Sequence, residues 1–196
     1  MAHLTFHSAG ESHGRGCFAF IEGIPYGLKV DLDFINAQLA RRQKGYGRGG
    51  RMKLEADQAE VLSGVRHGLS MGAPILLAVW NKDFRLEKAP ELDCPRPGHA
   101  DLAGHLKFDA PIRDVLERAS ARETAARVAC GALCRVLLRE FGIEARSHVV
   151  ALGPVEVPAG FAPGWEELAR ADESEVRCLH AESAAKMRAA IDEAKK

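Results

Sequence analysis

The chain has 196 residues, of which 46% are hydrophobic, so it can bury the core of one substantial domain. Lys plus Arg equal Asp plus Glu at 27 each, which argues against a protein that binds nucleic acid or a membrane surface through bulk charge. No apolar run approaches the ~20 residues that span a bilayer, and the first residues do not resemble a signal peptide, so we expect a cytoplasmic protein.

The N-terminal part predicts strands followed by one helix. Two short apolar runs are expected to pair as a hairpin around the loop AGESHG, namely residues 4–8 and 17–21. Residues 24–27 are typical of a turn. A helix is expected from a cap at Asp31 or Asp33 to about Lys44, with Gly45 ending it.

The middle of the chain predicts two more strands and a long irregular segment. Residues 60–65 alternate like a half-buried strand, and residues 74–80 form a continuous apolar run, as in a strand covered on both faces. Residues 45–53 are a glycine-rich basic loop between helix and strand. Residues 81–110, with three prolines, are expected to be a loop.

The clearest helix signal begins at Ser120. Ser120 and Glu123 have the spacing of a capping box, and the small residues that follow predict a central helix that ends near Phe141 and Gly142. A strand over 148–157 and a final amphipathic helix are expected next. Because the short strands are not regularly interleaved with crossover helices, the fold class is predicted to be α+β with mainly antiparallel strands.

The five cysteines are odd in number, and without an export signal they are expected to stay reduced. Cys130 and Cys134 lie four residues apart on one face of the expected central helix. No further metal ligands accompany them, so we interpret the pair as core packing and expect no metal site.

Four clusters combine glycine or serine with arginine and histidine, and they are the candidate functional segments. They are GESHG with His13; RRQKGYGRGGR with Arg41, Arg42, Arg48 and Arg51; PRPGHAD with Arg96 and His99; and ERASARET with Arg118, Ser120 and Arg122. Guanidinium groups bind carboxylates or phosphates through two hydrogen bonds, and glycines let backbone N–H groups approach the same anion. A helix start adds free N–H groups, and histidine exchanges protons near neutrality. The clusters predict a site for a polyanionic ligand with His13 and His99 as proton carriers.

Each cluster also has a structural explanation, and these alternatives remain open at this point. The AGESHG loop could be a solvated surface turn, and the Arg/Gly loop could be an RNA-binding segment. His99 could serve as a structural hydrogen-bonding group, and Ser120 could be a helix cap alone. Five other histidines lie in no comparable setting and are expected to be structural or exposed: His7, His67, His105, His148 and His180.

The four clusters, in this order, resemble those of chorismate synthases. Three motifs of that family stand here as GESHG (10–14), RPGHAD (96–101) and SARETAARVACGA (120–132), and RRQKGYGRGGRMKLEAD (41–57) matches the substrate-loop region. The resemblance covers this whole chain but about the first half of the family's usual length. It implies the family's β-α-β sandwich, apparently truncated, with residues 1–196 as the N-terminal part of a single domain whose C-terminal half is absent.

The resemblance implies a reaction and its cofactor. Chorismate synthases are lyases that remove phosphate from 5-enolpyruvylshikimate 3-phosphate by a 1,4-anti elimination and give chorismate, the last common step of aromatic amino acid biosynthesis. The reaction is redox-neutral overall but needs reduced FMN. NADPH as the flavin reductant, a separate flavin reductase and a homotetramer are further possibilities that the family suggests. Nucleic acid and membranes are not expected as partners.

The resemblance also implies roles for individual residues. His13 matches the histidine beside the substrate phosphate, and His99 matches the histidine beside the flavin. Arg42 and Arg48 match positions that bind the anionic substrate or NADPH. The tripeptide that contacts FMN corresponds to Arg118, Ala119 and Ser120.

Two departures from the family pattern affect these expectations. Many members read GGGRSS before ARET, whereas this chain reads VLERAS, so one serine is replaced by Ala119. The family's second half, with further FMN contacts and an aspartate thought to act as a base, is missing. An inactive fragment that keeps the FMN or anion site is therefore the alternative to an active enzyme.

Overall fold

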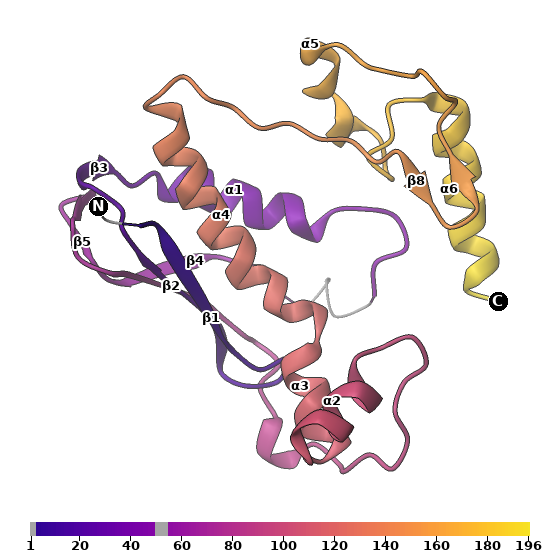
Figure 1. The fold of residues 1–196 in the computed structure, drawn as a ribbon, viewed down its shortest axis with the longest axis horizontal. Helices are drawn as coiled ribbons and strands as arrows, with labels where there is room; N and C mark the ends of the chain where they lie inside the picture. The colour runs from indigo at the N-terminus through magenta and orange to yellow at the C-terminus, as the bar shows by residue number, and fades with distance from the viewer. Residues whose placement is uncertain (1–2, 50–54) are drawn as a thin grey trace.

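The computed structural model describes residues 3–49 and 55–196, and it has an α+β fold. Within those residues every paired strand is antiparallel to its neighbour, as the sequence predicted. The main body contains a four-stranded sheet covered by long helices and a smaller three-stranded sheet, and a C-terminal unit lies to one side (Figure 1).

The four-stranded sheet has the order β1-β2-β7-β4. Its strands are Thr5–Gly10 (β1), Gly16–Glu22 (β2), Ile75–Trp80 (β7) and Ala59–Ser63 (β4). The predicted hairpin is confirmed, because β1 pairs with β2 and leaves residues 11–15 as the connecting loop. The predicted apolar strand is also confirmed: β7 lies between β2 and β4, and four of its six residues are buried.

Two helices pack on one face of this sheet, Leu32–Gln43 (α1) and Thr124–Arg139 (α4). Asp31 caps α1 by accepting a hydrogen bond from the N–H of Phe34 at 2.9 Å, as predicted. Four alanines of α4 are at most 2% exposed, so its backbone lies close to the sheet and to α1. The central position that the small residues predicted is confirmed.

The second sheet has the order β3-β6-β5, with Tyr26–Lys29 (β3), Leu69–Met71 (β6) and Val65–Arg66 (β5). Two expectations need correction here. Residues 24–27 are not only a turn, because Tyr26 and Gly27 begin β3. The strand expected over 60–65 is divided between two sheets, because the chain bends at Gly64 between β4 and β5.

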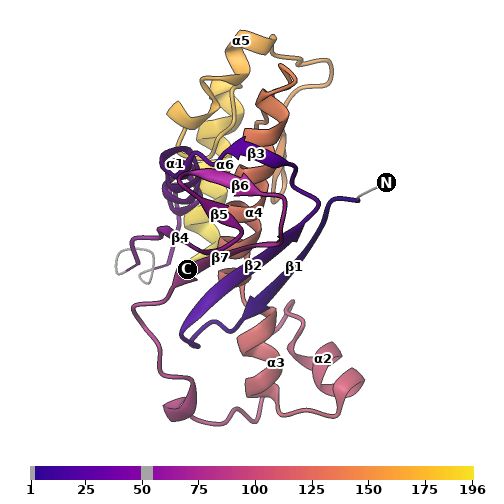
Figure 2. The same cartoon turned by 90° about the vertical axis from the view of Figure 1, so that its left-hand side faces the viewer.

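The expectation of a loop over residues 81–110 was wrong. The segment contains a short 3-10 helix, Leu86–Lys88 (η2), and an α-helix, Asp101–Phe108 (α2). Helix α2 packs against Ile112–Ala119 (α3) at the end of the β1-β2 hairpin (Figure 2). The two helices are stabilised by their contact with each other. The glycines and prolines of this segment have low helix propensity, so the local sequence did not predict α2.

The C-terminal unit contains a two-stranded hairpin, two α-helices and a 3-10 helix. Its elements are Ala151–Leu152 (β8), Val155–Glu156 (β9), Trp165–Leu168 (α5), Ala171–Glu173 (η4) and Ala181–Ala194 (α6). A single strand over 148–157 is wrong, because the chain reverses between β8 and β9 at Gly153, whose φ is 57°. The final amphipathic helix is confirmed, with Met187 fully buried in a cluster with Val176 and Cys178.

Among residues 3–49 and 55–196, no helix has the length and apolar character needed to cross a bilayer. Residues 41–49 form hydrogen bonds with the C-terminal unit, among them one from Arg41 to Asp172 of η4. Tyr46 donates a hydrogen bond through its hydroxyl to Asp192 of α6 at 2.6 Å, and its N–H donates to the carbonyl of Glu175 at 2.9 Å. The glycine-rich loop is therefore connected to both units.

The close contact of α2 with α3 generates a stability prediction. A Cβ placed on Gly104 would lie 2.3 Å from Cγ1 of Val115, so Gly104→Ala should lower the free energy of unfolding by about 1–3 kcal/mol. Gly131 in α4 is the control, because a Cβ there meets nothing within 4 Å and Gly131→Ala should be neutral or stabilising by up to ~1 kcal/mol. Urea denaturation of both variants tests this. Equal effects would mean that the two helices do not pack closely.

Candidate active site

The loop that contains His13 is held by hydrogen bonds from Asn81, the residue after β7. The buried Asn81 side-chain amide donates to the carbonyls of Ser12 and Gly14 at 3.2 and 2.7 Å and lies 3.3 Å from that of Glu11. The N–H of Asn81 also donates to the carbonyl of Arg15 at 2.8 Å. The loop is therefore anchored to the sheet through its backbone, and it is not a freely solvated turn.

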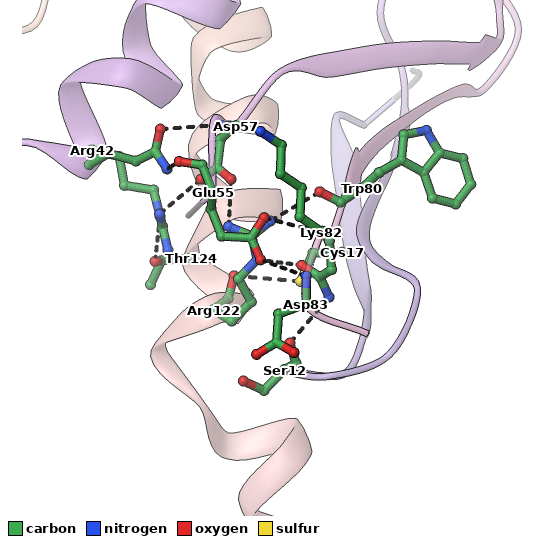
Figure 3. Close-up of polar contacts among 12 residues, drawn as sticks. Ser12, Cys17, Arg42, Glu55, Asp57, Trp80, Lys82, Asp83, Arg122 and Thr124 are labelled. Carbon is green, nitrogen blue, oxygen red and sulfur yellow. Dashed lines mark hydrogen bonds and ion pairs between the residues drawn. The ribbon is translucent and has the colours of Figure 1, made fainter. Parts of the chain in front are cut away.

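Arg122 links this anchor to a second buried group. Its Nε donates to the side-chain oxygen of Asn81 at 2.6 Å, and its Nη1 donates to Asp57 at 2.6 Å. Arg42 reaches the other carboxylate oxygen of Asp57 at 3.0 Å from α1 (Figure 3). Three of the four sequence clusters are thus connected through one network of hydrogen bonds.

In this network two arginines bind the carboxylate of Asp57, and the side chains of all three residues are buried from solvent. The side chains of Arg122 and Asp57 are 5% and 0% exposed, and that of Arg42 is 9% exposed. Burial lowers the pKa of Arg42, the Asp57 carboxylate opposes this shift, and the positive charge of Arg122 adds to it. Arg42 also donates through Nε to the hydroxyl of Thr124 at 2.9 Å, so most of its donors face inward.

His13 lies against a buried carboxylate at the end of α3. Glu117, whose side chain is 1% exposed, is 2.9 Å from Nδ1 of His13 and also accepts from the backbone N–H of His13 at 2.8 Å. The other ring nitrogen, Nε2, is 3.9 Å from Asp83. The imidazole is 19% exposed, so it is positioned by the protein while one side stays accessible.

His99 has a similar partner in Asp101, the first residue of α2. The Asp101 side chain is fully buried, and it lies 2.6 Å from Nδ1 of His99. Arg96 donates to the same carboxylate through Nε at 2.8 Å and through its backbone N–H at 3.0 Å. The hydrogen bond from Arg96 holds the pKa of Asp101 well below its usual range, so this carboxylate stays ionised beside His99.

The predicted FMN-contacting tripeptide forms the junction between α3 and the 3-10 helix Ala121–Glu123 (η3), which leads into α4. Arg118 is exposed, and its hydrogen bonds go to neutral oxygens, the carbonyls of Ser8 and Gly10 and the hydroxyl of Ser8. Ala119 ends α3. Ser120 donates to the hydroxyl of Ser12 at 3.1 Å, so the tripeptide adjoins the His13 loop.

The capping box is only half formed. The Ser120 hydroxyl accepts from the N–H of Arg122 at 3.3 Å and so caps η3. The Glu123 carboxylate does not reach back to Ser120; it accepts from the hydroxyl of Ser8 at 2.5 Å and from Arg127 at 2.7 Å. Glu123 is therefore diverted because β1 offers it a partner from another part of the chain.

Arg48 lies in a different place, in a groove between the glycine-rich loop and the C-terminal unit. The groove encloses about 500 Å³ and is lined by Lys44, Tyr46, Arg48 and Arg177 among others. Arg48 is exposed, and its Nε donates to the carbonyl of Lys44 at 3.3 Å. Arg48 thus faces this groove while Arg42 binds Asp57, although both belong to one sequence cluster and the charge of Arg48 contributes to lowering the pKa of Arg42. Arg51 falls outside the described residues.

Sequence reasoning missed three residues that organise the site: Asn81, Glu117 and, in its central role, Asp57. Asp57 stands within the matched loop region and Glu117 within VLERAS, but neither has a local pattern that indicates a buried partner. Asn81 follows a confirmed strand, which is the one signal that could have directed attention to it. Two other histidines are structural as expected: His180 caps α6, and His105 contacts the Ala110 carbonyl at 2.6 Å.

The five cysteines are free thiols, in agreement with the reduced state expected. Cys130 belongs to the core, with Cys134 packed beside it. A hydrogen bond between them raises the pKa of Cys130 and lowers that of Cys134 to about 7. In the described part of the chain, no cluster of three or more His, Cys, Asp or Glu side chains is arranged to hold a metal ion.

Comparison with known proteins decides the family. The model of the chorismate synthase family matches residues 4–196. The chain belongs to the chorismate synthase family. Curated chorismate synthases of Moorella thermoacetica and Carboxydothermus hydrogenoformans are 52% and 50% identical to it over 98% of this chain. A crystal structure of chorismate synthase is 40% identical, with a TM-score of 0.77 over 98% of this chain.

The chain spans about half the length of the chorismate synthases it matches, 53% of each of these two relatives and of the crystal structure. The shared fold is the α+β arrangement that the sequence predicted. The four sequence clusters lie inside the matched region, and three of them meet in the Asp57–Arg122–Asn81 network.

The burial of Asp57 generates a second stability prediction. Asp57→Asn leaves two buried guanidinium groups without a carboxylate and should lower the free energy of unfolding by about 3–5 kcal/mol. Asp172 is a matched control, because it also binds two arginines, Arg41 at 2.5 Å and Arg177 at 3.3 Å, but is 43% exposed. Asp172→Asn should therefore change stability by less than ~1 kcal/mol. Chemical denaturation tests both, and equal losses would contradict the role given to burial.

Proposed function

We propose that the complete protein is a chorismate synthase that eliminates phosphate from 5-enolpyruvylshikimate 3-phosphate to form chorismate. Membership of the family supports this proposal. The observation that carries it is the position of His13, an accessible imidazole fixed against the buried Glu117 where three family motifs converge. A site for a leaving phosphate needs a proton donor in such a place, held by rigid elements.

We propose His13 as the group that protonates the departing phosphate and His99 as the group that assists proton transfer at the flavin. In both residues Nδ1 lies within hydrogen-bonding distance of a buried carboxylate, Glu117 for His13 and Asp101 for His99. In His13 this arrangement leaves Nε2 to exchange a proton with a ligand. Nε2 of His99 lies 3.1 Å from Nη2 of Arg96, so a ligand that exchanges a proton there must compete with that contact. General acid or base assistance of this kind is typically worth ~10²–10⁴-fold in rate.

The donor groups around η3 fit an anionic cofactor. The charge of Arg118 is met only by neutral oxygens in its hydrogen bonds, so an anion can still be attracted to it. We propose that Arg118, Ala119, Ser120 and His99 contribute to an FMN site. Reduced FMN, when bound, supplies transient electron density for cleavage of the C–O bond. Ser120 orients the His13 loop through Ser12, and Arg42 and Arg48 attract the anionic substrate or NADPH.

The remaining parts of the proposal concern the complete protein. We propose that residues 1–196 are the N-terminal part of a single domain, in keeping with the 53% of the relatives' length that they cover. NADPH, used by this protein or by a separate reductase, would keep the flavin reduced. A cytoplasmic homotetramer is the expected assembly.

The same coverage favours one alternative, an inactive fragment that retains part of the FMN or anion site. Turnover by the 196-residue chain distinguishes the two, since the alternative requires binding of a ligand without product. An RNA-binding module, the third possibility from the sequence, has no observation in its favour here.

The proposed reaction is tested by its dependence on flavin. The complete protein, incubated anaerobically with 5-enolpyruvylshikimate 3-phosphate, should form chorismate only when reduced FMN is present. Absorbance of chorismate provides the measurement, with oxidised FMN and no flavin as controls. Product formed equally fast without flavin would refute the assignment.

The two histidines are tested by substitution in the complete protein. His13→Ala and His99→Ala should each lower turnover ~10-fold or more and change substrate affinity less, because each removes a proton carrier. His7→Ala is the control, since His7 is exposed on β1 and has no proposed role. Wild-type turnover in both variants would show that the histidines are structural.

A further inference from the structure

Glu117, in the last turn of α3, contacts the His13 loop through both its side chain and its backbone. Its carboxylate accepts from the backbone N–H of His13 at 2.8 Å and lies 2.9 Å from Nδ1 of the same residue. The backbone carbonyl of Glu117 accepts from the N–H of Ser12 at 2.9 Å. One residue of α3 thus binds the backbone and the ring of His13 together.

The backbone of His13 is held from the opposite side as well. Its carbonyl accepts hydrogen bonds from the N–H groups of Arg85 and Leu86 at 2.9 and 3.0 Å. With both peptide groups bound and Nδ1 against the carboxylate, the ring has little freedom to rotate. The position of Nε2 follows from that of Nδ1.

The chemistry of a carboxylate determines which ring nitrogen carries the proton. An ionised carboxylate can only accept hydrogen bonds, so Nδ1 must be the donor and must carry hydrogen. Arg113, whose Nη1 is 3.5 Å from Oε1 of Glu117, places positive charge beside this buried group. The neutral ring then has its lone pair on Nε2, and the protonated ring has its transferable proton there.

The Glu117 side chain is removed from solvent at 2% exposure. Burying a carboxylate is costly unless hydrogen-bond donors compensate for the lost water. The backbone N–H and the Nδ1 of His13 both lie within hydrogen-bonding distance of this carboxylate, so the contact with His13 offsets the cost of its burial.

We propose that Glu117 is a positioning residue that keeps His13 in the Nδ1–H tautomer, so that Nε2 alone exchanges protons with the substrate. The tautomer is a property of the folded protein, and its consequence for turnover rests on the function proposed above.

The test is nitrogen NMR of the complete protein labelled with ¹⁵N-histidine, with the His13 signals identified by their loss in His13→Ala. Near neutral pH, the neutral ring of His13 should be in the Nδ1–H form. In Glu117→Gln the amide oxygen should accept from the His13 backbone, and the NH₂ group should donate to Nδ1. The tautomer should therefore shift towards Nε2–H.

Two controls accompany this experiment. His105 contacts the carbonyl of Ala110 through Nδ1 at 2.6 Å, so its Nδ1–H form should be unchanged by Glu117→Gln in the same spectrum. Glu60→Gln removes an exposed carboxylate on β4 and should leave both histidines unchanged. Glu117→Asp keeps an acceptor-only carboxylate and should retain the Nδ1–H form of His13.

Turnover separates this inference from the proposed function. Glu117→Gln should lower kcat ~10-fold or more while KM changes less, and Glu117→Asp should recover part of the loss. A tautomer shift in a protein with no chorismate synthase activity would leave the positioning intact and refute the function. An Nε2–H tautomer in the wild type, an unchanged tautomer in Glu117→Gln, or an unchanged kcat in an active enzyme would overturn the proposal.

Discussion

The buried contact between Arg122 and Asp57 is the constraint on which the rest of the site depends. Arg122 stands at the start of the central helix layer, and through its two bound partners it connects that layer to the segment before β4 and to Asn81 at the end of β7. Asn81 in turn holds the backbone of the His13 loop. Desolvating a guanidinium group is costly, so the arrangement persists only where each donor finds an acceptor, and that requirement fixes the relative positions of three chain segments.

Arginine side chains from different parts of the sequence meet near η3. Arg42 and Arg122 share the Asp57 carboxylate. Arg118 is exposed and hydrogen-bonded to neutral oxygens, and the Glu123 carboxylate lies close enough to interact with its charge. The exposed guanidinium of Arg118 can still bind an anion, which agrees with the polyanionic ligand that the motifs predict.

The two candidate proton carriers, His13 and His99, each contact a buried carboxylate, although they lie in different kinds of local structure. His13 lies in a hairpin loop and is held by Glu117 across a long sequence separation, whereas His99 lies in a turn and is held by Asp101 two residues later. In each pair the carboxylate is buried and the imidazole is partly exposed. Burial keeps the acceptor dry and its contact strong, while exposure leaves the ring able to reach a ligand.

Local patterns in the sequence determined the β1-β2 hairpin, the Asp31 cap of α1, the buried strand β7 and the central helix α4, because each depends on residues near one another in the chain. The sequence motifs, which contain His13 and His99, also indicated the family. Only the tertiary structure decided α2, the reversal at Gly153 and the partners of the site. Glu117 and His13 are 104 positions apart, and Arg122 and Asp57 are 65 apart, so no local periodicity records their contact. Those pairs form because folding removes both members from water, and each then requires the other as its hydrogen-bonding partner.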